Sequence, residues 1–165
     1  VKNLFVNNCT FMGTDIGLRF KSARGRGGVV ENIYISDIGM TNIPGEAILF
    51  DMYYAAKDPI TLEGEKREMP VIQTLPVTEA TPIFRNFYFN NVYCNGADKA
   101  VFVRGIPEMR VSNIFFNNLT MKTDKGIEIV SDFSVNADDF AIEIPSVVSK
   151  KVSKKVNVKL EFILK

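Results

Sequence analysis

The sequence contains no histidine. This absence removes the commonest general base at neutral pH, the Ser–His and Cys–His nucleophile pairs, and most catalytic zinc sites. Its two cysteines, Cys9 and Cys94, cannot form a metal cluster by themselves. No run of eighteen or more apolar residues predicts a membrane span, and a net charge of +1 argues against a general nucleic-acid or anionic-membrane surface. Any anion site must therefore be local.

What the sequence does contain is a repeat. Short β-rich runs that open with Asn and close with polar turn residues begin at Asn3, Asn32, Asn86 and Asn113. About fourteen residues after each opening Asn comes a second strand-like run. These second runs are Gly17–Lys21, Ala47–Asp51, Ala100–Arg104 and Gly126–Val130. The first and second copies are 29 residues apart, the third and fourth 27, and an insertion separates the second from the third.

A period of this length, with short strands and no helical periodicity between them, predicts an all-β solenoid. Stacking each strand on its equivalent at about 4.8 Å per coil gives a single-stranded parallel β-helix. The residues expected to point inward are Leu4, Val6, Ile33, Ile35, Phe87, Phe89, Ile114 and Phe116. Cys9 and Cys94 fall two coils apart, about 10 Å, whereas a disulfide needs Cα atoms within about 7 Å. We therefore expect two free thiols.

The repeat predicts two regions, with coils over residues 1–130 and a divergent cap or tail over 131–165. Residues 55–82 interrupt the coils as a charged, proline-rich insertion, which is typical of a functional or disordered loop. The lysines at 150–155 have no interleaved aromatic residues, so a solvated strand or frayed end is expected there. Because the chain starts at Val1 without a signal segment, we expect a solenoid truncated at its N-terminal side, which would self-associate through the exposed apolar coil Val1–Phe11.

Gly17–Lys21 is the candidate functional strand. Because successive strand side chains point to opposite faces, Leu18 and Phe20 should face one way and Arg19 and Lys21 the other. Arginine offers a planar fork matched to a carboxylate, and lysine adds a mobile point charge, so the pair could receive an anion. Two basic residues on an exposed strand also serve solubility and edge protection, and the spacing alone leaves both interpretations open.

Three local motifs carry a resemblance that covers about residues 1–130. The first is Gly17–Lys21 followed by the glycine-rich Arg24–Gly28, and the second is Ala47–Tyr54. The third runs from Pro82–Asn86 through Gly105–Glu108. Their order resembles the C-terminal part of family 28 glycoside hydrolases, the polygalacturonases and related pectin hydrolases.

The resemblance implies a right-handed parallel β-helix whose groove binds a galacturonan chain. Arg19 and Lys21 would match the pair that holds a galacturonate carboxylate next to the scissile bond. Tyr53 or Tyr54 would match a tyrosine that contacts the sugar. Only one of these neighbours can face the groove, and Tyr53 is preferred, with ordinary loop packing as the alternative. The resemblance implies no metal or organic cofactor, and it implies a secreted or periplasmic parent protein because pectin is met outside the cell.

The sequence departs from the family in its catalytic part. Family members are inverting hydrolases that need a carboxylic acid and a carboxylate base, and their catalytic aspartates precede the Arg-x-Lys strand. Only sixteen residues precede Gly17, and the family's Gly-His-Gly segment cannot exist without histidine. We therefore expect no catalytic residue in this chain, since Asp138 and Asp139 follow that strand. The alternatives are a non-catalytic carbohydrate-binding or adhesive module that uses residues 55–82, and a purely structural fragment.

Overall fold

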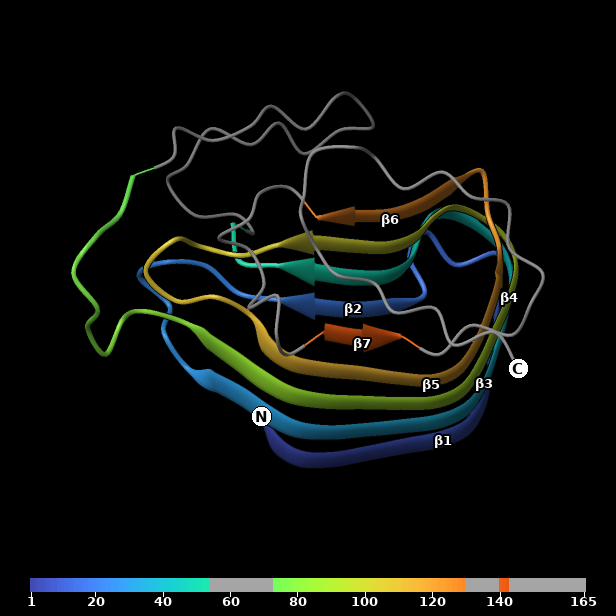
Figure 1. Cartoon of the computed structure of the whole chain (residues 1–165), viewed down its shortest axis with the longest axis horizontal. Coiled ribbons are helices and arrows are strands. Elements are labelled where there is room, and N and C mark those ends of the chain that lie inside the picture. Colours follow the sequence, from blue (N-terminus) through green and yellow to red (C-terminus); the bar gives the residue numbers. More distant parts are fainter. Residues whose placement is uncertain (54–72, 130–139, 143–165) are drawn as a thin grey trace.

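The computed structural model describes residues 1–53, 73–129 and 140–142, and every element in these ranges is a strand (Figure 1). The strands are β1 (Lys2–Met12), β2 (Leu18–Lys21), β3 (Val29–Asp51), β4 (Ile83–Arg104), β5 (Ser112–Lys122), β6 (Lys125–Ile129) and β7 (Phe140–Ile142). They pair in parallel in the order β1-β3-β4-β5-β7, while β2 pairs with β3 and β6 with β4. Figure 1 shows how the long strands β3 and β4 bend. β3 pairs with β1, β2 and β4, and β4 pairs with β3, β5 and β6.

The strands pair so that each copy of the sequence repeat aligns with the next. In the first runs, Leu4 pairs with Ile33, Ile33 with Phe87, and Phe87 with Ile114. In the second runs, Leu18 pairs with Ile48 and Ile48 with Val101. Equivalent residues of successive copies therefore lie side by side. The prediction of an all-β, parallel β-helical solenoid is confirmed.

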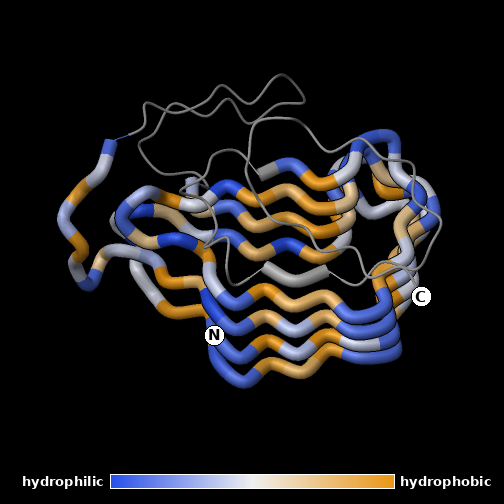
Figure 2. The backbone as a smooth tube through the Cα atoms, viewed as in Figure 1, coloured by the Kyte–Doolittle hydropathy of each residue, from blue (hydrophilic) through white to orange (hydrophobic). Residues whose placement is uncertain are grey.

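The corners of the coils are built by asparagine. Asn3, Asn32, Asn86 and Asn113 all have a positive φ of 55–62°, a conformation that asparagine tolerates better than most residues. The side chains of Asn32, Asn86 and Asn113 each donate from Nδ2 to Oδ1 of the asparagine before them, at 3.0, 2.9 and 2.7 Å respectively. We call this column the asparagine ladder. Figure 2 shows the resulting alignment of polar corners along the stacked coils.

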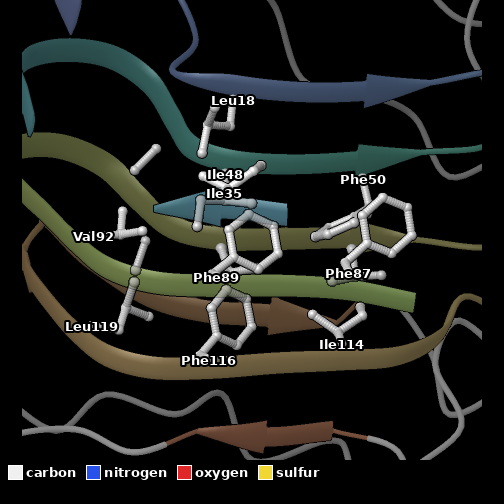
Figure 3. Close-up of a cluster of buried hydrophobic side chains, with 14 of the residues drawn as sticks. Leu18, Ile35, Ile48, Phe50, Phe87, Phe89, Val92, Ile114, Phe116 and Leu119 are labelled. Carbon is white, nitrogen blue, oxygen red and sulfur yellow. The ribbon is translucent and has the colours of Figure 1, made fainter. Parts of the chain in front are cut away.

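The core is the inward column that the repeat predicts. Ile33, Ile35, Phe87, Phe89, Ile114 and Phe116 are all buried. Figure 3 labels the last five of them. The Phe89 and Phe116 rings stack with centroids 4.7 Å apart, a favourable aromatic geometry. Leu4 and Val6 occupy the same column in the first coil, but Leu4 is 40% exposed and Val6 is only half-buried. Their exposure agrees with the exposed apolar coil expected over Val1–Phe11, because among the described strands β1 pairs on one side only.

The outer face of the same sheet carries a second stack, in which Phe5, Tyr34, Tyr88 and Phe115 lie ring on ring with centroids 4.8–5.2 Å apart. These rings are partly exposed.

Glu31 of β3 bridges the neighbouring coils, since it contacts Lys2 of β1 and Arg85 of β4. Hydrogen bonds from Lys2 and from Arg85 lower the pKa of the Glu31 carboxyl below its usual value.

The two cysteines are free, as predicted. Cys9 pairs in register with Ile38, whereas Cys94 pairs with Met40 one coil further on. Burial raises the pKa of the Cys94 thiol to about 11.

The described residues include no helix long and apolar enough to cross a membrane, and no cluster of three or more metal-ligating side chains lies among them.

The predicted boundaries at residues 55–82 and 131–165 fall largely outside the described residues. Residues 73–82 of the expected insertion are described and lead into β4. In the expected cap, β7 pairs in parallel with β5, with Ile114 opposite Phe140.

Candidate functional site

β2 has the two-sided character that its sequence predicts. Leu18 is buried and Phe20 stacks on Phe50 of β3 at 4.9 Å between ring centroids, while Arg19 and Lys21 are exposed on the other side. Gly17 directly precedes the strand, and a Cβ there would lie only 2.4 Å from the carbonyl oxygen of Ala47. Glycine is therefore required for β2 to lie this close to β3.

Arg19 has an acidic neighbour on its own loop. Its Nη2 atom lies 3.6 Å from Asp15 Oδ2, and Asp15 Oδ1 accepts a hydrogen bond from the backbone N–H of Ile16 at 2.9 Å. The Asp15 side chain is largely exposed, so this ion pair is screened by water and contributes little to stability.

Lys21 begins a row of alternating charge across the coils. It pairs in register with Asp51 of β3, which pairs with Arg104 of β4. Asp51 and Arg104 are 4% and 2% exposed and share three hydrogen bonds of 2.7–3.0 Å. Asp51 Oδ1 also accepts the backbone N–H of Tyr53 at 2.9 Å. The exposed Lys21 thus borders a buried, hydrogen-bonded ion pair.

The row beside Arg19 is apolar. Arg19 pairs with Leu49, and Leu49 with Phe102 in the next coil. Leu49 and Phe102 are buried and form a small cluster with Ile16, separate from the main core. Lys99 Nζ lies 4.4 Å from the centroid of the Phe102 ring. The two exposed cations of β2 therefore lie directly beside buried residues of β3.

Tyr53, the preferred tyrosine of the sequence analysis, is described, whereas Tyr54 lies outside the described residues. The Tyr53 side chain is 1% exposed, and its ring centroid lies 5.4 Å from Arg104 Cζ and 5.5 Å from Arg24 Cζ. Arginine beside an aromatic ring is an attractive cation–π arrangement. A role in contacting sugar stays a prediction, and it requires that the ring become accessible.

Sequence reasoning did not find a second buried ion pair that lies next to Tyr53. Arg24 donates through Nε to Glu108 Oε1 at 2.6 Å and through Nη2 to Glu108 Oε2 at 2.8 Å. Burial of the Glu108 carboxyl acts to raise its pKa. The hydrogen bond from Arg24 and several smaller interactions act in the opposite direction and together outweigh burial, so the pKa of Glu108 is lowered. Both residues stand within motifs that carry the family resemblance, but 84 positions separate them and no periodicity connects them.

The arrangement around β2 is suited to binding an anion. It offers two exposed cations on a rigid strand, held from behind by packed apolar side chains and by buried ion pairs. Asp138 and Asp139 lie outside the described residues.

β2 lies within a part of the chain that a known family matches. A family model described as glycosyl hydrolases family 28 matches residues 1–81, a range that contains β1, β2, β3 and the candidate residues Arg19, Lys21, Tyr53 and Tyr54. No curated protein and no solved structure matches the chain. Residues 1–81 thus form a region of the family 28 glycosyl hydrolase type.

Proposed function

We propose that this chain binds galacturonan through Arg19 and Lys21, as the substrate-holding part of a polygalacturonase-like glycoside hydrolase. The observation that carries the proposal is the exposure of both cations on one side of β2, within the region that the family model matches. A uronate carboxylate would take the guanidinium fork of Arg19 and the ammonium of Lys21. The site should therefore prefer the free acid to its methyl ester.

The proposal assigns no catalytic residue to this chain. Inverting hydrolysis needs an acid that protonates the leaving oxygen and a base that activates water. We propose that this chain holds the polymer without cleaving it. Tyr53, once accessible, or Tyr54 would supply the aromatic contact to the sugar beside the carboxylate site.

Calorimetric titration of the 165-residue chain with oligogalacturonate tests the binding site. Lys21→Ala should weaken binding about tenfold or more, since a hydrogen bond to a charged group contributes about 1.5–3 kcal/mol. Lys122→Ala removes an exposed lysine of β5 and is the matched control, for which we expect unchanged affinity. Equal affinities of the unmodified and Lys21→Ala proteins would overturn the assignment.

A reducing-end assay on polygalacturonate tests the absence of catalysis. We expect no new chain ends from the purified protein. Clear hydrolysis would refute the proposal that acid and base are missing, and Asp138 and Asp139 would then be the first residues to substitute. Equal binding of neutral glycans and uronates would favour an adhesive or general carbohydrate-binding module.

Two further proposals concern location and association. Because pectic polymers lie outside the cell, we propose a secreted or periplasmic protein. We also propose self-association through Val1–Phe11, supported by the exposure of Leu4 and Phe5 and by the pairing of β1 on one side only among the described strands. A strictly monomeric particle in sedimentation at high concentration would contradict the second proposal.

A further inference from the structure

The turn that directly follows Lys21 is held by several hydrogen bonds and by one close backbone approach. The Ser22 backbone N–H donates to the Asp51 carbonyl at 2.9 Å, and Ser22 Oγ donates to the Gly27 carbonyl at 3.2 Å. The N–H groups of Gly25 and Gly27 both donate to the Ala80 carbonyl at 3.0 Å. At Gly27, where φ is +58°, a Cβ would lie 2.2 Å from the Glu79 carbonyl oxygen. This turn is therefore built to hold one conformation.

Arg24 is the side chain through which this turn reaches the third coil. Its guanidinium is bonded bidentately to Glu108, and it also donates to the Gln73 carbonyl at 2.7 Å. The Arg24 and Glu108 side chains are 15% and 3% exposed, so water competes little for either group. Bidentate arginine–carboxylate pairs fix direction as well as distance.

Glu108 is a suitable anchor because its own backbone is fixed. It lies in the turn that follows β4, where the Met109 N–H donates to the Ile106 carbonyl at 3.2 Å and these two residues form a β-bridge. β4 in turn carries Arg104, the partner of Asp51, which lies beside Lys21 in register. The Arg24–Glu108 pair therefore ties the turn after β2 to the turn after β4, and the Asp51–Arg104 pair ties the strand residue beside Lys21 to the last residue of β4.

We propose that Glu108 is a positioning residue for the uronate site. Through Arg24 it fixes the turn that begins one residue after Lys21, and so it fixes the direction in which the Lys21 ammonium group meets a carboxylate. This inference rests on the proposed binding of galacturonan by Arg19 and Lys21. Glu108 itself does not touch the sugar, so its effect must pass through the position of Lys21.

A double-mutant cycle separates this role from a purely structural one. Glu108→Gln keeps the size of the side chain and removes the charge. Oligogalacturonate affinity is measured by calorimetry for the unmodified chain, Glu108→Gln, Lys21→Ala and the double variant, at low ionic strength so that residual binding through Arg19 stays measurable. We expect Glu108→Gln to weaken binding about three- to tenfold in the parent, the scale found for residues coupled in one network, and by less than about twofold when Lys21 is already alanine.

Two controls keep the experiment decisive. Glu128→Gln breaks a different ion pair, the 3.0 Å contact with Lys99, and should leave affinity unchanged. Arg24→Gln breaks the same Arg24–Glu108 ion pair by changing the arginine instead of the glutamate. It takes the place of Glu108→Gln if that variant does not fold. Circular dichroism and the melting temperature establish folding in each case.

The outcomes distinguish this inference from the proposed function. An equal loss in both Lys21 backgrounds, or no loss in the parent, would overturn the positioning role and leave galacturonan binding intact. If the unmodified chain does not bind oligogalacturonate at all, the proposed function fails, and the positioning role fails with it. A loss that disappears in the Lys21→Ala background supports both.

Discussion

Removal of Asp51 should destabilise the protein more than any substitution on its surface. The carboxylate and the Arg104 guanidinium share three hydrogen bonds while both side chains are almost fully buried. Asp51→Ala leaves the Arg104 charge buried without this partner, which typically costs about 3–5 kcal/mol. Since whole domains are stable by about 5–15 kcal/mol, this loss is a large fraction of the total. The melting temperature should fall by roughly 10 °C, at about 2–4 °C per kcal/mol for a chain of this size.

Urea unfolding followed by far-ultraviolet circular dichroism measures this loss. The same experiment on Asp51→Asn/Arg104→Met removes both charges and keeps an acceptor for the Tyr53 N–H, so the double variant should lose less than about 2 kcal/mol. Asp98→Ala is the control, because its partner Lys125 is 61% exposed and such pairs contribute at most about 1 kcal/mol. A loss below about 1 kcal/mol for Asp51→Ala, or a double variant as unstable as the single one, would refute the reasoning from burial.

Three further predictions follow from the core, the thiols and the outer face. Phe89→Ala should cost about 3–5 kcal/mol in urea unfolding because it empties a buried aromatic position, whereas Tyr34→Ala on the outer stack should cost about 1 kcal/mol. With a thiol reagent at about pH 8, Cys9 should react in the folded protein and Cys94 only after unfolding, since Cys94 is buried and its pKa is raised; two equally fast thiols would contradict this. The pKa of Glu31 is lowered by its two basic partners, so its contribution to stability is present above its ordinary pKa and is lost as the pH falls below that value. Glu31→Gln should therefore lose less stability than the parent between about pH 5 and 3, and parallel pH profiles would exclude this contribution.

The sequence predicts the regular part of this fold because a solenoid is nearly one-dimensional. Once the repeats are aligned, each residue has known neighbours in the coils before and after it. This is why the inward position of Phe87 and the separation of the cysteines could be predicted. The exposure of Leu4 depends on the end of the stack rather than on the repeat, and it agrees with the exposed apolar coil expected over Val1–Phe11.

The environment of the candidate site was only partly accessible from the sequence. The same alignment sets Lys21, Asp51 and Arg104 at the close of successive second runs, so their alternating charges could have been found there. The contact between Arg24 and Glu108 could not, because both lie in irregular turns whose direction no period determines. The burial of Tyr53 has the same origin, since it lies two residues beyond the end of β3 and Arg24 of one of those turns lies against its ring.

The asparagine ladder gives the stack of coils a direction. Asn113, Asn86 and Asn32 each donate toward the first coil, and Asn86, Asn32 and Asn3 each accept from the coil behind. Aligned amides polarise one another, so reversing one of them disfavours its neighbours. Two copies that met first coil to first coil would set the two Asn3 amides against each other with like groups facing, whereas the other end of the column lies beside β7, which already pairs with β5. The ladder thus disfavours a symmetric contact through the first coil, because such a contact uses the same surface of both copies.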